Sequence, residues 1–218
     1  MTKNPSPIQY FNYGPRELEY LTKQDPILGE AIASIGIIQR PLTPDLFEAL
    51  VSSIVSQQIA KKAYFTVWSR IKELTGEITP QTICALDRET LKACGLSYKK
   101  TDWIQTAAAM VSTGELCLAE LETMTNDELI KTLTKLPGIG VWTAQMLMIF
   151  ALERPDVLSY GDLAIRRGIM NLYGLTELSK TQFEVIRQRL SPYNSIASLY
   201  FWELSHEAKE LGSKPNSE

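Results

Sequence analysis

The chain has 218 residues, 44% of them hydrophobic and 22% charged, which is typical of a folded globular protein and excludes a disordered chain. No run of about 18 uncharged apolar residues occurs. The start of the chain also lacks a signal-peptide pattern, so we expect no membrane association. With 22 basic against 25 acidic residues, the overall charge argues mildly against a nucleic-acid partner unless the basic residues gather on one face.

Cysteine and histidine offer little metal chemistry. Cys84, Cys94 and Cys117 form no C-x-x-C pair, which argues against both a disulfide framework and a thiolate zinc site. His206 is the single histidine and can complete neither an acid–base pair nor a metal triad. A metalloenzyme is therefore disfavoured.

Apolar residues recur at helical spacing along most of the chain, and no segment shows sustained period-two alternation. We predict an all-α fold of about ten helices. Arg16 to Ile37 should form two short helices divided near Pro26, and Asp45 should cap the next one. The other helices are expected over residues 46–56, 61–74, 80–86, 87–94, 98–112, 125–136, 141–152, 163–173, 179–190 and 195–211. Residues 1–13 and 212–218 should be partly disordered.

The most informative segment is Leu-Pro-Gly-Ile-Gly at 136–140, between an amphipathic helix and an apolar one. Gly138 and Gly140 permit a sharp turn and leave no Cβ over the amides that open the second helix, so these N–H groups can face an anion such as a phosphate. A tight helix–helix connection is the alternative. Because residues 141–152 are nearly all apolar, we expect that helix to be buried on all sides.

Asp162 follows the turn Ser159-Tyr160-Gly161 and precedes a helix that begins at Leu163. At this place it is expected to cap the helix, whose N-terminus stabilises negative charge. A carboxylate held in this way can also stabilise a developing cation, so the capping and catalytic roles are compatible.

These residues carry a family resemblance. The hairpin at 136–140, Trp-Thr-Ala at 142–144 and Gly-Asp-Leu-Ala-Ile-Arg-Arg at 161–167 resemble the signature of the helix-hairpin-helix (endonuclease III) superfamily of DNA glycosylases. Within it, the likeness is to the 3-methyladenine DNA glycosylase II family, which excises alkylated bases. The likeness extends over roughly residues 42–205, including Leu50 to Lys62 and Cys94 to Lys100.

The resemblance implies a two-lobed helical fold with the active site in a cleft between the lobes. It divides the chain into N-terminal helices (1–40) that pack with the C-terminal lobe, a middle lobe (41–160) with the helix-hairpin-helix at 126–152, and C-terminal helices (161–218). The β-rich N-terminal domain of some relatives has no room in this sequence. We expect a monomer in the cytoplasm, associated with the nucleoid, or in the nucleus of a eukaryote.

It further implies a reaction and residues that perform it. The target base in damaged double-stranded DNA would be flipped out and excised, with Asp162 as the catalytic carboxylate. The base pocket is expected to include Trp142, Met146, Tyr160 and Trp202, since aromatic faces attract a cationic base. DNA contacts are expected from Gly138, Gly140, Val141, Thr143, Gln57, Gln58, Lys61 and Lys99. Either glutamine could fill the gap left by the flipped base, and ordinary packing or surface roles remain alternatives for the tryptophans, Tyr160 and the glutamines.

The resemblance also leads to one expectation about strand cleavage and two about cofactors. Relatives that also cleave the strand resemble this segment but carry lysine where Trp142 stands, so we expect no lyase activity and an abasic product. No cysteine follows Cys117, so the four-cysteine iron–sulfur cluster of many relatives is expected to be absent. No cofactor should be required, although the resemblance implies a Na⁺ or K⁺ ion on backbone carbonyls of Thr134, Leu136 and Ile139.

Two rival interpretations remain. A non-catalytic DNA-binding module would use the hairpin as a phosphate grip, but it would not need Asp162. A helical scaffold without a nucleic-acid role agrees with the acidic pI near 5.4, but it leaves the joint occurrence of the hairpin, Trp142 and Asp162 unexplained. The accepted bases, whether 3-methyladenine alone or also 7-methylguanine and hypoxanthine, stay open.

Overall fold

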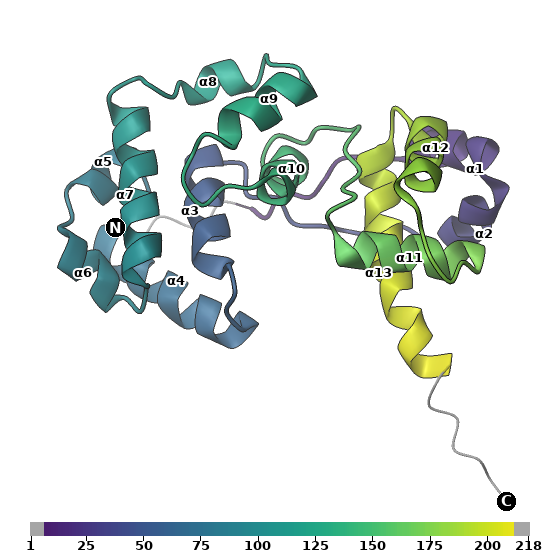
Figure 1. Ribbon diagram of the computed structural model, residues 1–218, viewed down its shortest axis with the longest axis horizontal. Coiled ribbons are helices and arrows are strands. Elements are labelled where there is room, and N and C mark those ends of the chain that lie inside the picture. The colour runs from purple at the N-terminus through teal and green to yellow at the C-terminus, as the bar shows by residue number, and fades with distance from the viewer. Residues whose placement is uncertain (1–6, 212–218) are drawn as a thin grey trace, which may run out of the picture. The chain divides into compact units, whose positions relative to one another are not determined.

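The computed structural model describes residues 7–211, with side chains for residues 7–206. Over this range the chain forms thirteen helices and no β-strand (Figure 1). The helices divide between two units. One is Thr43–Leu152, and the other combines the segment ending at Leu42 with the chain from Glu153 onward. The all-α expectation is confirmed.

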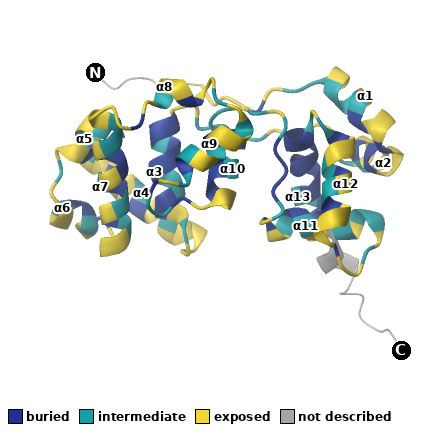
Figure 2. Ribbon diagram, turned by 45° about the horizontal axis from the view of Figure 1, so that its top comes forward, coloured by how far each residue is buried: buried dark blue, intermediate teal, exposed yellow. Residues whose placement is uncertain are grey.

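The unit Thr43–Leu152 is organised around α3 (Leu46–Ser56), which packs against α4, α7 and α10. Leu50, Val51 and Ile54 of α3 are almost fully buried, and α3 is largely dark blue in Figure 2. Asp45 caps this helix as predicted, accepting from the N–H of Glu48 at 2.7 Å. The remaining helices of this unit are α4 (Lys61–Thr75), α5 (Pro80–Cys84), α6 (Arg88–Ala93), α7 (Tyr98–Ser112), α8 (Leu118–Leu121), α9 (Asn126–Leu133) and α10 (Val141–Phe150).

The second unit contains α1 (Pro15–Gln24), α2 (Pro26–Ile35), α11 (Leu163–Tyr173), α12 (Lys180–Leu190) and α13 (Asn194–Leu211). Here α11 packs along α13. The junction of α1 and α2 is tied to the C-terminal helices through Asp25, whose carboxylate accepts from the hydroxyl of Tyr173 at 2.6 Å and from the guanidinium of Arg189 at 2.7 Å. The N-terminal helices therefore share a core with the C-terminal ones.

The chain passes from one unit to the other after Leu152, earlier than the expected boundary at residue 160. Hydrogen bonds explain the difference. Ser195 at the start of α13 donates its backbone N–H to the carbonyl of Pro155 at 2.9 Å, and its hydroxyl accepts from the N–H of Val157 at 3.0 Å. Residues 154–157 are therefore bound to the start of α13 before Asp162 is reached.

Two local features were not expected from the sequence. Of residues 1–13, residues 7–13 lie in the described range and are ordered: Tyr10 forms an isolated β-bridge with Pro41, and Phe11 is buried. The remaining residues that were expected to be partly disordered, 1–6 and 212–218, lie outside the described residues. The sequence analysis also missed α8, because a four-residue helix is too short to show a helical period. No helix in the described part of the chain has the length and apolar character needed to cross a bilayer.

Candidate active site

The hairpin joins α9 to α10. Thr125 and Glu128 form a capping box at the start of α9, in which the Glu128 carboxylate accepts from the N–H of Thr125 at 2.9 Å. After α9 the N–H of Leu136 donates to Leu133 O at 3.1 Å, and that of Ile139 donates to Leu136 O at 3.2 Å. The chain thus turns in two hydrogen-bonded steps before α10 begins.

The two glycines of the hairpin differ in whether the fold requires a glycine at their position. Gly138 has a φ of +84°, and a Cβ placed on it would lie 2.3 Å from Cε3 of Trp103. Both its conformation and the indole therefore require glycine. Gly140 has an ordinary φ of −91°, and a Cβ there would meet nothing within 4 Å. The fold does not demand glycine at position 140, but its absence of a side chain leaves the start of α10 open.

That start presents backbone N–H groups. The first intrahelical bond of α10 runs from Ala144 N–H to Gly140 O at 2.9 Å, so the N–H groups of Val141 and Thr143 precede the first hydrogen bond of the helix. Thr143 is only 6% exposed, which limits any contact with DNA to its backbone. This geometry agrees with the predicted anion grip.

The expectation that this helix is buried on all sides was wrong at its first turn. Val141 is 54% exposed and Trp142 47%, whereas Leu147, Met148 and Ile149 are buried. The exposed residues are the first two of the helix, beside the hairpin, whereas Thr143 and Ala144 of the same turn are already buried. Met146 lies one turn beyond Trp142 and is half-buried. Trp142 thus offers part of its ring to solvent while the rest of α10 packs.

The turn after α3 separates the two candidate glutamines. The side-chain amide of Gln57 donates to the carbonyl of Gly138 at 2.8 Å, which directs it into the hairpin. Gln58 is exposed and has a φ of +54°, a conformation that residues other than glycine seldom adopt. Ile59, which follows, is 38% exposed. Of the two glutamines, Gln58 is the one whose side chain is accessible.

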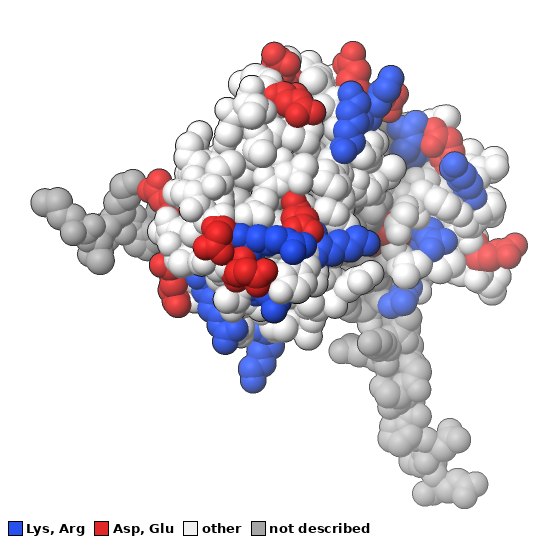
Figure 3. Space-filling view, turned by 60° about the vertical axis from the view of Figure 1, so that its left-hand side comes forward, with Lys and Arg blue, Asp and Glu red and all other residues white. Residues whose placement is uncertain are grey.

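The candidate lysines also differ in their surroundings. Lys61 begins α4 and is exposed, and Lys99 is exposed with its Nζ 4.9 Å from the ring centre of Trp103. Lys100, the next residue of α7, is half-buried and donates to backbone carbonyls of Val55 and Gln57. On the face drawn in Figure 3, basic and acidic side chains are interspersed, in agreement with the modest net charge.

Asp162 caps α11, as predicted. Its Oδ1 accepts from the N–H of Ala164 at 2.9 Å and from that of Ile165 at 3.0 Å, and the residue is 7% exposed. Gly161 before it and Leu163 after it are exposed. The carboxylate is therefore fixed in orientation by two main-chain donors near the surface of its unit, a suitable arrangement for a group that must keep one position during a reaction.

Two further candidates from the same unit make packing contacts. Tyr160 lies edge-to-face on Phe183 with ring centres 5.1 Å apart, and the guanidinium of Arg166 is 5.2 Å from its ring centre. Trp202 is half-buried, with the guanidinium of Arg40 at 5.9 Å from its ring centre. Both aromatic residues thus have structural contacts, and their place in a base pocket stays a prediction.

Sequence reasoning missed the structural roles of Trp103 and Lys100. Both lie on α7 and reach residues far away in the chain, Trp103 to Gly138 and Lys100 to the end of α3. No local pattern marks either contact. A lysine two residues after a helix start reads as solvated surface, and a tryptophan at helical spacing reads as core.

Comparison with known proteins supplies the class. The family model described as "HhH-GPD superfamily base excision DNA repair protein" matches residues 51–193, which include the turn after α3, the hairpin and Asp162. The chain belongs to this superfamily.

Individual relatives narrow the assignment. DNA-3-methyladenine glycosylase 1 of Schizosaccharomyces pombe is 34% identical over 164 residues, which cover 73% of this chain and 72% of the relative. The crystal structure of a DNA-3-methyladenine glycosidase from Bacillus halodurans matches with a TM-score of 0.84 at 34% identity, covering 93% of this chain and 95% of that one. The S. pombe 3-methyladenine DNA glycosylase in complex with abasic DNA matches at a TM-score of 0.74 and 30% identity, covering 87% and 96%. Within the superfamily, the chain is thus a member of the 3-methyladenine DNA glycosylase family.

Proposed function

We propose that this protein is a monofunctional DNA glycosylase that excises alkylated bases such as 3-methyladenine and 7-methylguanine from double-stranded DNA and leaves an abasic site. The observation that carries the proposal is the buried Asp162 carboxylate, held by two main-chain amides in a chain that also has the glycine hairpin. Relatives with the same fold bear the name of this activity, and one of them is seen with abasic DNA.

The reaction is a hydrolysis at C1′ of the sugar. The N-glycosidic bond breaks and its electron pair leaves with the base, whose positive charge it neutralises. Water forms the new bond to C1′ and loses a proton. Asp162 would stabilise the cationic sugar or accept that proton, since a carboxylate can do either. The half-exposed ring of Trp142 would stack on the cationic base, with Met146, Tyr160 and Trp202 as further candidates for the pocket.

The unit Thr43–Leu152 would hold the DNA. The backbone amides of Val141 and Thr143, at the start of α10, would bind a phosphate, helped by Lys61 and Lys99. Gln58, rather than Gln57, would fill the gap left by the flipped base, because the side chain of Gln57 is bound to Gly138. Replacing Gln58 by alanine should therefore slow excision in duplex DNA more than in single-stranded DNA, where no gap has to be filled.

A monovalent cation is compatible with the hairpin. Among the described residues, no three His, Cys, Asp or Glu side chains are grouped to hold a metal ion. A Na⁺ or K⁺ ion would therefore depend on carbonyls, for which Thr134, Leu136 and Ile139 are the candidates. Leu136 O accepts one hydrogen bond from Ile139 N–H and keeps a second lone pair. Such an ion would add positive charge near a bound phosphate.

The decisive test compares the wild type with Asp162→Asn on alkylated duplex DNA, with chromatography of the released bases. Asparagine retains an oxygen that can accept from Ala164 and Ile165, so it keeps the cap and removes the charge. Excision should fall by at least about 100-fold while DNA binding remains. Asp87→Asn, which alters the corresponding cap of α6, should leave excision unchanged.

Full activity of Asp162→Asn would show that Asp162 caps α11 and has no catalytic role. If the wild type binds duplex DNA but releases none of the alkylated bases, the non-catalytic DNA-binding module becomes the better description.

A further inference from the structure

One face of α7 holds two loops that are distant in sequence. The first is the turn 57–60, between α3 and α4, and the second is the hairpin 136–140. Lys100 contacts the former and Trp103 the latter, and these residues lie three positions apart, on the same side of the helix. All of these contacts lie within the unit Thr43–Leu152.

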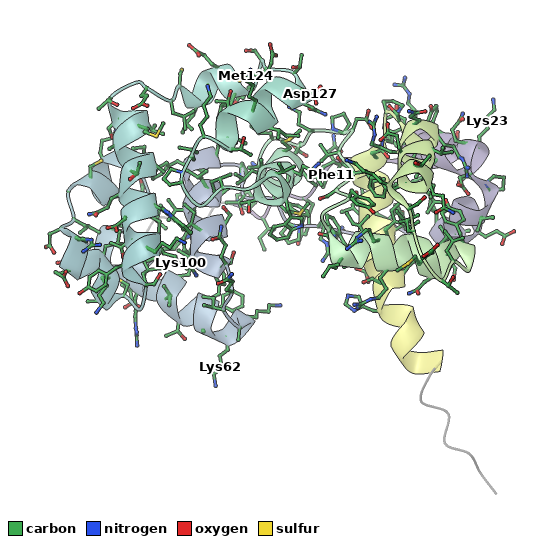
Figure 4. All side chains as sticks on the ribbon, viewed as in Figure 1. Phe11, Lys23, Lys62, Lys100, Met124 and Asp127 are labelled. Carbon is green, nitrogen blue, oxygen red and sulfur yellow. The ribbon has the colours of Figure 1, made fainter. Side chains whose placement is uncertain are left out.

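Lys100 binds the C-terminus of α3. Lys100 is labelled in Figure 4. Its ammonium donates to Val55 O at 2.8 Å and to Gln57 O at 2.6 Å. These carbonyls lie at the negative end of the helix dipole, where a cation is stabilising. The backbone hydrogen bond that closes this end of α3 is long, since the N–H of Gln57 lies 3.4 Å from Ile54 O. The lysine thus determines where α3 stops and how the turn leaves it.

Gln57 then connects the turn to the hairpin. Its backbone carbonyl accepts from Lys100, and its side-chain amide donates to Gly138 O at 2.8 Å. On the other side of Gly138, the indole of Trp103 lies where a side chain would be, and Lys99 covers that indole at 4.9 Å. Gly138 is therefore held by a hydrogen bond to its carbonyl and by ring contact at its Cα.

We infer that Lys100 and Trp103 are positioning residues that join the turn 57–60 and the hairpin 136–140 into one preorganised surface for damaged DNA. The inference rests on the proposed function, in which the turn supplies Gln58 and the hairpin supplies the phosphate grip. Neither residue needs to touch the reacting base. Their effect is to fix the spacing of the two loops before DNA binds, so that no ordering cost is incurred on binding.

The test uses Lys100→Met, which keeps the length of the side chain and removes its donors, and Lys100→Arg, which retains donors. Amide hydrogen exchange is measured at Ile139, whose N–H closes the hairpin, and global stability is measured by urea unfolding. With Lys100→Met, exchange at Ile139 should rise at least about tenfold beyond the change expected from global stability. Gln57→Met should have a similar effect, and the double variant should add little to either.

Activity is the second readout. At enzyme concentrations below saturation, single-turnover excision should fall at least about tenfold in Lys100→Met and recover in Lys100→Arg, because the cost of ordering the two loops weakens DNA binding. Lys23→Met, an exposed lysine of α1, should change neither exchange at Ile139 nor excision, which controls for the lost charge.

A purely structural role for Lys100 would give lower global stability with unchanged relative exchange at Ile139, and this outcome would overturn the inference. If instead the wild type excises no base but Lys100→Met still accelerates exchange at Ile139, the coupling of the loops stands and the proposed function fails. The two ideas are thus tested separately.

Discussion

Gly168 of α11 lies against the backbone of Phe201 in α13, so closely that a Cβ on Gly168 would be 1.9 Å from the carbonyl oxygen of Phe201. This contact joins the helix that Asp162 caps to the helix on which it packs. Since Asp162 begins α11, the absence of a side chain at position 168 fixes where the carboxylate lies within its unit.

Gly168→Ala should therefore destabilise the protein and displace Asp162. The overlap is with main-chain atoms, so no side-chain rotation can relieve it, and α11 must move. We expect a loss of about 1–3 kcal/mol or more in the free energy of unfolding. Urea unfolding measures this loss, and excision by the folded fraction should fall as well.

Arg167→Ala is the matched control, because Arg167 is the exposed neighbour on the same helix. It should change the free energy of unfolding by no more than about 0.5 kcal/mol. Because alanine favours a helix over glycine by about 1 kcal/mol, propensity alone would stabilise Gly168→Ala, and a variant as stable as Arg167→Ala would mean that the approach of α11 to α13 does not require glycine.

Helix positions could be predicted well from the sequence because local chemistry determines them. Asp45, Thr125 and Ser179 each cap a helix where a short polar residue precedes an apolar period. The helices Leu46–Ser56, Tyr98–Ser112 and Leu163–Tyr173 have the predicted bounds. In these places the start of the helix is determined by one capping side chain and the three residues that follow it.

Features that depend on tertiary contacts were not predictable. Phe11 looks like part of a polar terminus until its N–H is seen to donate to Arg40 O at 2.9 Å. The apolar run after Gly140 reads as uniformly buried, yet its first two residues, Val141 and Trp142, are exposed. The turn at the hairpin glycines could be predicted from the sequence. The contact that requires glycine at position 138 could not, because the indole of Trp103 comes from another helix.

The Asp25 network should contribute strongly to the stability of its unit. Asp25 is 2% exposed, caps α2 through Leu28 N–H at 3.1 Å, and accepts from Tyr173 and Arg189. Asp25→Ala removes a cap and two bonds to a charged group, so we expect a loss of about 2–5 kcal/mol in urea unfolding. A loss below about 1 kcal/mol would show that water replaces the carboxylate.

Tyr173 should make stability fall at high pH. Burial, and then its hydrogen bond to Asp25, raise the pKa of Tyr173 above its ordinary value of 10.0. Below pH 10 both states keep the phenol proton. Above it, the unfolded chain loses the proton first, so folding becomes less favourable as pH rises.

Between about pH 10 and 11, the free energy of unfolding of the wild type should fall more steeply than that of Tyr173→Phe, by up to about 1.4 kcal/mol per pH unit. Urea unfolding over this range measures both slopes. Parallel slopes would mean that the phenol is not kept protonated by the fold.

Thiol labelling should distinguish the three cysteines. Cys84 and Cys117 are exposed, whereas Cys94 is buried at 6% exposure, and burial raises the pKa of its thiol. The thiolate is the reactive form, so Cys94 should react slowly both because it is inaccessible and because it is protonated. At neutral pH two cysteines should react rapidly and the third only on unfolding. Three rapid equivalents would show that the contact of Cys94 with α4 opens readily.

Because tryptophan occupies position 142, we expect the protein to leave the DNA strand intact. Trp142 stands in the exposed first turn of α10 and has no amine, so it cannot form a Schiff base with C1′ of the sugar. Incubation with alkylated duplex DNA should give strands that break only after alkaline treatment. Addition of sodium borohydride during the reaction should trap no covalent complex. A trapped complex would instead identify an active lysine elsewhere. Lys61→Met and Lys99→Met would then be examined first, since these exposed lysines lie next to the turn 57–60 and on the indole at the hairpin.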